Sequence, residues 1–411
     1  MLFRIPFKPA PLTAVLIFSL TVVAHAQHES TGGSNKEMMG GGAIGGSTSR
    51  PTSPKPATRP ASTTVKKRPT ATTTTPTTTT TTTKRPVTTT PANNADYYFK
   101  QGESLYNAKK YSEAMDAYER AVQLNPSMGN AYYRMGWINN DIEEYDEAVP
   151  LLTRATSLLP TYAAAYFELG YAYKKLNRYP EALAAYTKST QLKNDYAGAY
   201  YDMGWIQNDQ KNYDDAANNL RLALRYQPNY PDAHAELGYA LRYLGRYSEA
   251  VEEYQAAISQ KSDMGLAYLG LGDVYYYNTK EYKLAVSAYK EGLRLRPGSA
   301  FANYNLAWCY NDMEQYNDAI PALREAIRIK PEYPEAYNEM GYALHQLSRF
   351  PEAVQAYQVA IRQKPDYASA HYNLALSYVA MRNRVGAMEE YRILQRIDPA
   401  RATKLQNQLA R

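Results

Sequence analysis

The sequence has 411 residues, with 46 Lys and Arg against 40 Asp and Glu and a formal net charge of +6. Residues 27–94 hold nine basic against two acidic residues, and residues 1–26 hold two more basic ones, which leaves 35 basic and 38 acidic residues in 95–411. The positive charge therefore lies outside the aromatic-rich part of the chain, which argues against a nucleic-acid-binding protein.

Residues 1–26 have the pattern of a secretory signal peptide. Arg4 and Lys8 precede an apolar run from Leu12 to Ala24, and Ala24-His25-Ala26 is a small-x-small cleavage site. The run of 13 residues is shorter than the roughly 20 that a membrane-spanning helix needs. We expect an exported mature chain with no transmembrane segment, in the bacterial periplasm or on the cell surface; eukaryotic secretion with O-glycosylation of the Thr tract is the alternative.

Residues 27–94 contain a Gly-rich piece, MMGGGAIGG, and then a long tract of Thr and Pro with almost no aromatic or large aliphatic residue. Such a segment cannot bury enough apolar surface to offset chain entropy, so we predict a disordered basic linker. Two readings of its charge stay open: attraction to an anionic envelope polymer, or a solvated spacer.

From Ala95 onward the sequence repeats with a period of 34 residues. A small residue recurs at this spacing, with one interval of 35, at Gly102, Gly136, Gly170, Gly204, Gly238, Gly272, Ala307, Gly341 and Ala375. Twelve residues later an Ala follows at Ala114, Ala148, Ala182, Ala216, Ala250, Ala319, Ala353 and Ala387, and thirteen later at Ala285. A Pro closes seven of the nine units, at Pro126, Pro160, Pro228, Pro297, Pro331, Pro365 and Pro399.

This pattern resembles the tetratricopeptide repeat family, whose unit of 34 residues follows W-x2-L-G-x2-Y…A-x3-F…P. The second unit matches at Tyr132, Met135, Gly136, Tyr145, Ala148, Leu152, Ala155 and Pro160. The resemblance covers residues 95–401. Its mild departures are Ala307 and Ala375 for Gly, Asn194 and Ser262 for Pro, and Asn139 and Gln207 for an aromatic residue. It implies an all-α fold, an α-solenoid of tandem antiparallel helix pairs wound as a right-handed superhelix.

The physics of the pattern favours the same fold. Gly and Ala let two helices approach closely, apolar residues three and four apart form a stripe, and Pro ends the second helix. Each unit has too small a core to be stable alone, so the units must stack. Residues 402–411 are predicted to cap the last unit, and the extra residue of the sixth unit is placed in the turn between Tyr275 and Tyr282.

All three tryptophans occur in one recurring phrase, MGWINND at 135–141, MGWIQND at 203–209 and LAWCYND at 306–312. At 100° per residue, Trp137 lies roughly 140° from the predicted core stripe. In tetratricopeptide repeats this second face of the first helix lines a concave groove that holds peptides, as the resemblance implies here. The ligand-binding candidates on that face are Tyr133, Trp137, Asn140, Asp141, Phe167, Tyr171, Tyr201, Trp205, Asn208, Asp209, Tyr239, Tyr304, Trp308, Asn311, Asp312 and Tyr342. Two readings stay open: contact with a ligand, or packing between neighbouring first helices.

The Asn-Asp pair that ends the phrase is unfavourable in a helix. Asp141, Asp209 and Asp312 are expected in the last helical turn, where the macrodipole disfavours an acid, and both residue types are poor helix formers. The repeated choice indicates a local demand, such as hydrogen bonds from the Asn side chains to a ligand backbone.

The units also alternate in type. Acidic units with Trp alternate with more basic or neutral units with Tyr, such as those containing Lys174, Lys175 and Arg242, and the sixth unit at Gly272 fits neither type. Duplication history explains this without function; a used groove would present alternating charge to an extended ligand.

No set of residues suggests catalysis, a metal site or a cofactor. The five His are dispersed, and Cys309, the one Cys, reads better as a small buried residue than as a reactive thiol. We therefore expect a protein that is not an enzyme.

Two functions from different classes follow. We favour a protein-interaction scaffold that binds an extended peptide or a helix of one or more cell-envelope proteins in the aromatic groove. The alternative is an envelope solenoid that binds glycans by stacking Trp and Tyr on sugar rings.

Overall fold

The computed structural model describes residues 94–409. The expected signal peptide, 1–26, and residues 27–93 of the expected linker lie outside the described residues, as do residues 410–411. Every described element is helical, and none of these helices combines the length and the apolar character that crossing a membrane requires.

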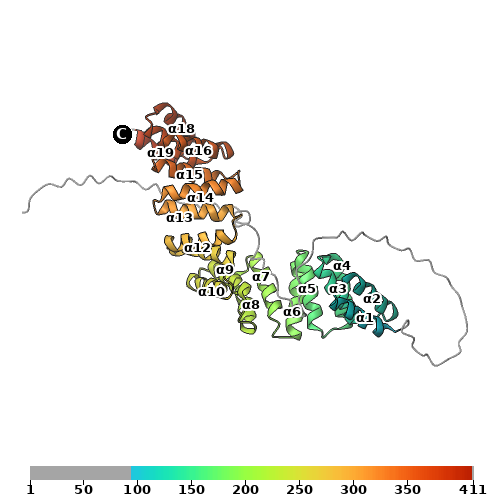
Figure 1. The fold of residues 1–411 in the computed structure, drawn as a ribbon. Helices are drawn as coiled ribbons and strands as arrows, with labels where there is room; N and C mark the ends of the chain where they lie inside the picture. The colour runs from blue at the N-terminus through green and yellow to red at the C-terminus, as the bar shows by residue number, and fades with distance from the viewer. Residues whose placement is uncertain (1–93, 410–411) are drawn as a thin grey trace, which may run out of the picture.

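Eighteen α-helices form nine pairs, which confirms the predicted units and their antiparallel arrangement. The first helices of the pairs are α1 (Ala95–Asn107), α3 (Gly129–Asp141), α5 (Ala163–Lys175), α7 (Ala197–Asp209), α9 (Pro231–Tyr243), α11 (Gly265–Asp273), α13 (Ala300–Asp312), α15 (Pro334–Gln346) and α17 (Ala368–Ala380). The second helices are α2 (Tyr111–Leu124), α4 (Tyr145–Leu158), α6 (Tyr179–Leu192), α8 (Tyr213–Tyr226), α10 (Tyr247–Gln260), α12 (Tyr282–Leu295), α14 (Tyr316–Ile329), α16 (Phe350–Gln363) and α18 (Arg384–Ile397). The pairs stack into an elongated, bent solenoid (Figure 1).

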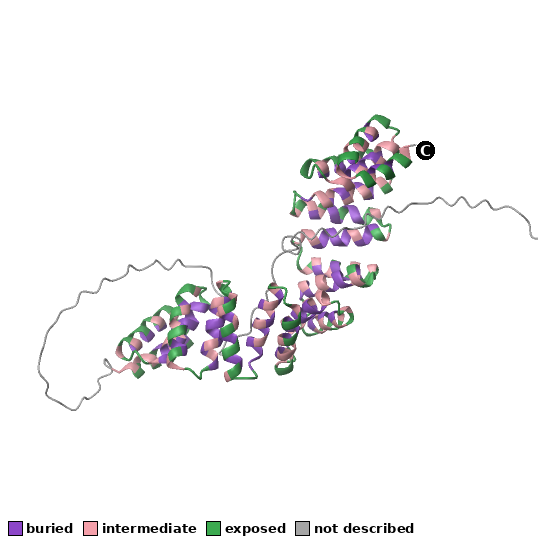
Figure 2. Ribbon diagram, turned by 180° about the vertical axis from the view of Figure 1, so that it is seen from behind, coloured by how far each residue is buried: buried purple, intermediate pink, exposed green. Residues whose placement is uncertain are grey.

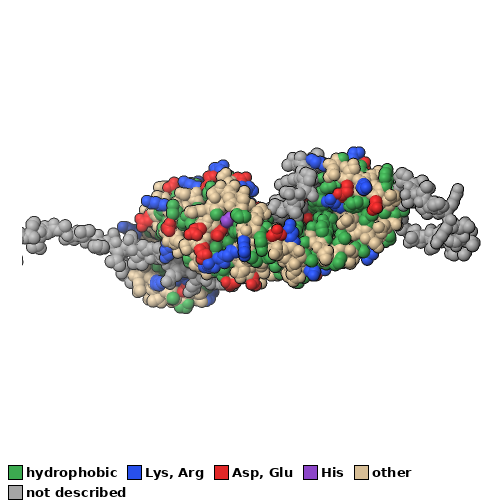
Figure 3. All heavy atoms as spheres, turned by 90° about the horizontal axis from the view of Figure 1, so that it is seen from below, with side chains coloured by type: hydrophobic (Ala, Val, Ile, Leu, Met, Phe, Trp, Pro, Cys, Tyr) green, Lys and Arg blue, Asp and Glu red, His purple; other side chains and the backbone are tan. Residues whose placement is uncertain are grey.

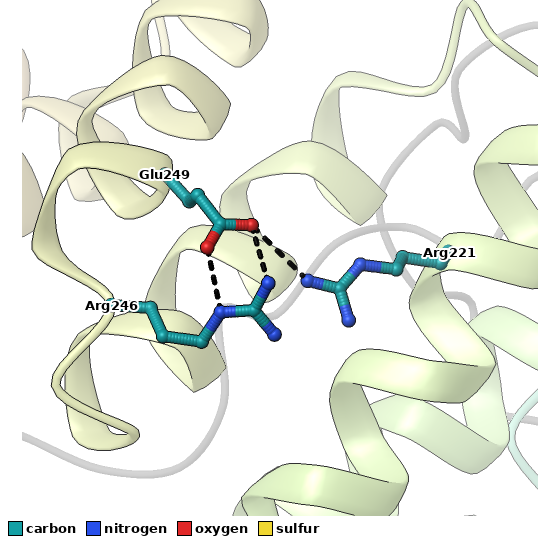
Figure 4. Close-up of polar contacts among 3 residues, drawn as sticks. All are labelled: Arg221, Arg246 and Glu249. Atoms are coloured by element: carbon teal, nitrogen blue, oxygen red, sulfur yellow. Dashed lines mark hydrogen bonds and ion pairs between the residues drawn. The ribbon is translucent and has the colours of Figure 1, made fainter.

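The first helices form the inner layer of this solenoid. Successive first helices contact one another, as α3 does with α5 and α15 with α17, whereas successive second helices do not approach as closely. Second helices lie on the outer side. One exposed ion pair joins two of them, between Arg221 of α8 and Glu249 of α10, and Arg246 also contacts this carboxylate (Figure 4).

Two positions of each first helix make the contact with the preceding unit. The third residue is Ala in α3 to α17 and is at most 2% exposed, but it is Tyr97 in α1, which is 48% exposed. The tenth residue is likewise buried in all units after the first, and in α1 it is the exposed Ser104. Burial therefore continues from unit to unit (Figure 2).

Cys309 is the tenth residue of α13 and is fully buried, which confirms its prediction as a small core residue. Burial raises the pKa of its thiol, which keeps the reactive thiolate form scarce.

The first helices end in the same way in every unit. One residue with positive φ follows each of them, and only Gly245 among these nine is a glycine. After α3, the N–H of Glu144 donates to the carbonyl oxygen of Asn139 at 2.9 Å, which satisfies a carbonyl at the end of the helix. Asp141, Asp209 and Asp312 are the last residues of their helices, as the sequence predicted.

The extra residue of the sixth unit is accommodated differently from our expectation. It widens the helix into a π-helix, η2 (Val274–Thr279), which continues α11, instead of lengthening the turn. The N–H of Glu281 donates to the carbonyl of Tyr275, six residues earlier, where the equivalent bond elsewhere spans five. A single inserted residue fits a helix by adding one residue to one turn.

A terminal helix, α19 (Pro399–Leu409), covers the last unit. It begins three residues before the predicted boundary at 402, since Pro399 is suited to the first helical position. Leu405 is fully buried beside Ala375 and Leu394, so the capping role is confirmed.

In seven of the nine first helices a glycine lies where the two helices of the unit cross, and α13 and α17 hold Ala307 and Ala375 there. A Cβ on Gly136 would lie 2.5 Å from Cγ of Leu152, and one on Gly170 would lie 2.8 Å from Cδ1 of Tyr186. Tyr186 is fully buried and its hydroxyl donates to Asp202, so this ring is held at both ends.

We predict that Gly170→Ala lowers the free energy of unfolding by about 2 kcal/mol, because the pinned ring cannot move away. Gly136→Ala should change it by less than about 1 kcal/mol, since the seventh unit already holds Ala307 opposite Leu323 at the same spacing. Urea unfolding followed by circular dichroism measures both; equal losses would contradict the role of the pinned Tyr186.

Candidate functional site

The candidate site is the inner face, defined here by the fifth, sixth, ninth and twelfth residues of the first helices. Besides Trp137, the ninth residue is aromatic in five further units, and these residues are Tyr171, Trp205, Tyr239, Trp308 and Tyr342. These five rings are partly exposed. The face that the helical periodicity predicted is thus present, and the question is what its residues contact.

Trp137 and Trp308 each pack between two units. Trp137 is 5% exposed, and its ring centre lies 5.2 Å from that of Tyr106 in the preceding unit and 6.1 Å from that of Tyr133. Trp308 lies 6.2 Å from Tyr276 of the preceding unit and 5.5 Å from Tyr304. The packing role left open by the sequence is therefore real for both rings.

A second aromatic contact repeats along the inner face. The first residue of a second helix meets the ninth residue of the next first helix edge to face. The pairs, at centroid distances of 6.0–6.4 Å, are Tyr145 with Tyr171, Tyr179 with Trp205, Tyr213 with Tyr239 and Tyr316 with Tyr342. Each pair holds a partly exposed ring in one orientation relative to the preceding unit.

The Asn residues of the Trp phrase bind the next unit. Nδ2 of Asn140 donates to the carbonyl and to Oε2 of Glu168, both at 3.0 Å. Nδ2 of Asn208 donates to the same two groups of Glu236, at 3.0 and 2.8 Å. The local demand that the sequence indicated is therefore met within the chain, which corrects the idea that these amides donate to a ligand backbone.

Asn311 repeats the contact, with Nδ2 at 3.3 Å from Oε2 of Glu339. The Oδ1 atoms of the three Asn are buried and accept no hydrogen bond within the described residues. All three side chains act as donors from the twelfth residue of one first helix to the sixth residue of the next.

The alternation of charge between units also arises from contacts between neighbouring units. Lys174, a twelfth residue, forms a buried ion pair with Asp202, the sixth residue of the next unit, and its Nζ also lies 5.0 Å from the ring centre of Trp205. The basic and acidic units thus neutralise each other across their boundary. This corrects the expectation that the groove presents alternating charges to a ligand.

The sixth unit departs from this pattern because Gly270 occupies the sixth position. Asp273, a ninth residue, takes over and accepts from Arg242 at 2.6 Å, from Tyr289 at 2.7 Å and from Asn305 at 3.3 Å. This unit fits neither sequence type because its acidic residue stands at the ninth position instead of the sixth.

Burial divides the predicted ligand-binding residues into two groups. The buried ones are Tyr133, Trp137, Asn140, Phe167, Tyr201, Asn208, Tyr304 and Asn311. Phe167 and Tyr201 have no exposed surface, so a ligand cannot reach them in this conformation and they are corrected to packing residues. The accessible ones are Asp141, Tyr171, Trp205, Asp209, Tyr239, Trp308, Asp312 and Tyr342.

The sequence alone did not predict the acidic partners Glu168, Asp202, Glu236, Asp273 and Glu339. Four of them stand 28 residues after a twelfth-position donor, and this fixed spacing was the available signal. On a helical wheel these residues fall between the core stripe and the predicted groove.

Potential metal ligands and histidines are dispersed among the described helices. Within residues 94–409, no group of three His, Cys, Asp or Glu side chains is placed to hold a metal ion. His371 contacts Glu390 and the carbonyl of Pro365, which makes it a structural residue of the last unit. Charged and hydrophobic side chains are interspersed over the surface that Figure 3 presents.

Models of the tetratricopeptide repeat match most of the described helices. The matches described as "TPR repeat" or "Tetratricopeptide repeat" cover residues 95–128, 129–162, 170–208, 201–265, 236–300, 309–348 and 341–381. None of the curated proteins matches the sequence.

Of three similar solved structures, two are described as TPR proteins. The crystal structure of YrrB, "a TPR protein with an unusual peptide-binding site", is 24% identical over 46% of this chain and 99% of its own, with a TM-score of 0.44. The structure of pilF from Pseudomonas aeruginosa is 22% identical over 52% and 98%, with a TM-score of 0.45. A TPR repeat-containing protein from Cytophaga hutchinsonii is 17% identical over 67% and 99%, with a TM-score of 0.43.

The buried pair between Lys174 and Asp202 gives a first prediction. Lys174→Met should lower the free energy of unfolding by about 3 kcal/mol, because it leaves a buried carboxylate without its cation. Adding Asp202→Asn should recover most of this loss, since an amide still accepts from Tyr186. Arg221→Met, at the exposed pair, should cost less than about 1 kcal/mol. Urea unfolding compares the four chains, and a small loss in Lys174→Met would refute the importance of the buried pair.

Glu339 gives a second prediction. Burial raises the pKa of its carboxyl to about 7, although Asn311 and Asn338 act to lower it. The folded state then holds this proton more tightly than the unfolded chain, so stability should rise as pH falls from 8 to 5 and be lost as pH rises through 7. Glu339→Gln should remove this part of the pH dependence and stabilise the protein by about 1 kcal/mol at pH 8. Thermal melts of both chains at pH 5, 6, 7 and 8 test it; parallel curves would show that Glu339 does not titrate in this range.

Proposed function

The chain belongs to the tetratricopeptide repeat family, and from this premise we propose that it is an exported, non-enzymatic scaffold that binds a peptide segment or helix of a cell-envelope protein along its inner face. The carrying observation is the row of partly exposed rings at the ninth position, Tyr171, Trp205, Tyr239, Trp308 and Tyr342. Export rests on the sequence of residues 1–26.

The rings suit binding because they are already ordered. Edge-to-face contacts with the preceding unit hold Tyr171, Trp205, Tyr239 and Tyr342, so little conformational entropy remains to be lost when a ligand covers them. Tyr and Trp are also the residue types most enriched among binding hot spots. The accessible carboxylates of Asp209 and Asp312 end α7 and α13, the helices that carry Trp205 and Trp308.

Charged groups of the inner face pair with one another, which leaves a contact surface with little free charge. Glu103 is paired with Arg134, Lys174 with Asp202 and Arg242 with Asp273. A ligand would therefore meet aromatic surface and a few polar groups more than free charge, and its affinity should depend only weakly on salt.

Site-specific photo-crosslinking tests this proposal. A benzophenone amino acid placed at Tyr171 or at Tyr239 of the mature chain should crosslink specific envelope proteins, and the same probe at Tyr226, on the outer helix α8, should not. The double variant Tyr171→Ala, Tyr239→Ala should capture at least tenfold less envelope protein than the parent chain. The matched control is Tyr97→Ala, Tyr226→Ala, which removes two exposed rings away from the inner face.

The outcomes separate the alternatives. Equal capture by both double variants would reject the inner face as the binding site. Retention on purified envelope polysaccharide that depends on Tyr171 and Tyr239, without any crosslinked protein, would replace the scaffold by the glycan-binding solenoid.

A further inference from the structure

Three acidic side chains of the inner face are neutralised by a basic residue of a neighbouring unit. The pairs are Glu103 with Arg134, Asp202 with Lys174 and Asp273 with Arg242. The basic group of each pair also lies over a ninth-position ring, with Arg134 at 5.1 Å from the ring centre of Trp137, Lys174 at 5.0 Å from that of Trp205 and Arg242 at 5.9 Å from that of Tyr239. An acid near such a ring thus holds a cation three times within the chain itself.

Glu339 of the eighth unit occupies the same position as Asp202. Each is the sixth residue of its first helix and contacts the twelfth residue of the preceding first helix. That residue is Lys174 opposite Asp202, but it is Asn311 opposite Glu339. Asn311 donates a hydrogen bond without bringing a positive charge, so this contact does not neutralise the carboxylate of Glu339.

The neighbouring first helices do not supply a cation either. Helices α13, α15 and α17 contain Asp312, Glu335 and Glu339 but no Lys or Arg. Glu335 lies 3.9 Å from Lys364, which leaves Asp312 and Glu339 as the acids of these helices on the inner face. The inner face of the last three units is therefore acidic, in contrast to the paired charges of the earlier units.

Glu339 also differs in its accessibility from the other carboxylates that contact an Asn. Glu168 and Glu236 accept from Asn140 and Asn208, but they are only 2% and 0% exposed. Glu339 is partly exposed. A ligand can therefore reach this carboxylate without displacing the packing between two units.

Two further groups beside Glu339 suit a cation. Oδ1 of Asn311 belongs to the amide that donates to Glu339, and this buried oxygen accepts no hydrogen bond within the described residues. Tyr342 follows three residues after Glu339, so its partly exposed ring lies on the same side of the helix. An ammonium has three N–H donors and a guanidinium five, so either can use both acceptors. Its charge also favours the face of an aromatic ring.

We propose that Glu339 binds a basic side chain, Lys or Arg, of the peptide that lies along the inner face, with Oδ1 of Asn311 as a second acceptor and the ring of Tyr342 beside the cation. This inference rests on the proposed function and adds a contact that determines which peptides bind. A neutral side chain would leave the carboxylate uncompensated, and an acidic one would be repelled by Glu339 and Asp312.

The contact should depend on pH. Burial raises the pKa of the Glu339 carboxyl to about 7, and a bound cation favours its ionised form. The ionised fraction increases about tenfold between pH 6 and pH 8, so the affinity for a basic peptide should increase by about the same factor.

The other titratable groups around Glu339 do not oppose this direction. They are Asp312 and Tyr304 of α13, Tyr357 of α16, Tyr367 before α17 and His345 of α15. Burial raises the pKa values of the three tyrosines, which stay neutral at pH 8. Burial lowers the pKa of His345, which keeps its ring neutral over most of the range.

Selection from a random dodecapeptide library displayed on phage tests the proposal. The baits are the mature chain, residues 27–411, and its Glu339→Gln variant, both at pH 8. We expect peptides enriched on the parent chain to share a Lys or Arg at one position, and this preference to disappear on Glu339→Gln. The matched control Glu325→Gln removes the same charge from the outer helix α14 and should select the same peptides as the parent chain.

Anisotropy with one selected peptide, labelled with tetramethylrhodamine, measures the contact itself. Replacing its basic residue by citrulline or acetyl-lysine should weaken binding at least tenfold at pH 8, and Glu339→Gln should do the same. The parent chain should bind about tenfold more tightly at pH 8 than at pH 6, and Glu339→Gln equally at both. A purely structural role of Glu339 would not produce this difference. If Glu339→Gln melts lower than the parent chain, the citrulline or acetyl-lysine peptide repeats the test on the unaltered protein.

Three results would overturn the inference. Enriched peptides without a preferred basic residue would leave the inner face as a peptide-binding surface but remove the role of Glu339. A basic preference that persists on Glu339→Gln would assign the cation to another acid. If neither chain enriches any peptide, this inference fails, and crosslinking at Tyr171 and Tyr239 still decides the proposed function separately.

Discussion

Every unit after the first depends on the unit before it, because the third and tenth residues of its first helix have no other surface to cover them. A bulky residue is compatible with the third position only in α1, where Tyr97 is exposed; in all later units the position is a buried Ala. Stability in such a stack is the sum of small terms within units and between neighbours. The polar contacts of the inner face contribute to the terms between neighbouring units.

Those polar contacts give the stack its register. A hydrophobic surface tolerates small displacements, but the bonds from Asn140 to Glu168 and from Asn208 to Glu236 require one relative position of two helices. Burying the Lys174 and Asp202 pair has a desolvation cost that its attraction offsets only in good geometry. These contacts therefore hold the inner face in one arrangement. A surface that is rigid before binding loses less conformational entropy when a ligand binds.

The candidate site shows how far a helical wheel can be trusted. The periodicity placed Trp137, Trp205 and Trp308 on the inner side of the first helices, away from the core stripe of their own units. It did not identify their neighbours, because Tyr106, Tyr179 and Tyr276 lie in the preceding unit and a wheel contains only one helix. The unfavourable Asn residues correctly indicated a local demand, but their partner was the next unit and not a ligand. Only the stacked arrangement brings a twelfth residue to the sixth residue of the next helix.

The sequence by itself determined the repeat, the nine helix pairs, the small residue at each crossing, the terminal cap and the buried place of Cys309. Each of these depends on contacts within one unit or on a pattern repeated in every unit, and such patterns survive in the linear order of residues. Tertiary structure alone decided which inner-face rings are exposed, that the alternating charges pair with each other, and that the extra residue widens a helix at Val274–Thr279. These features depend on the distance and angle between neighbouring units, which are fixed by the packing of side chains from several helices at once.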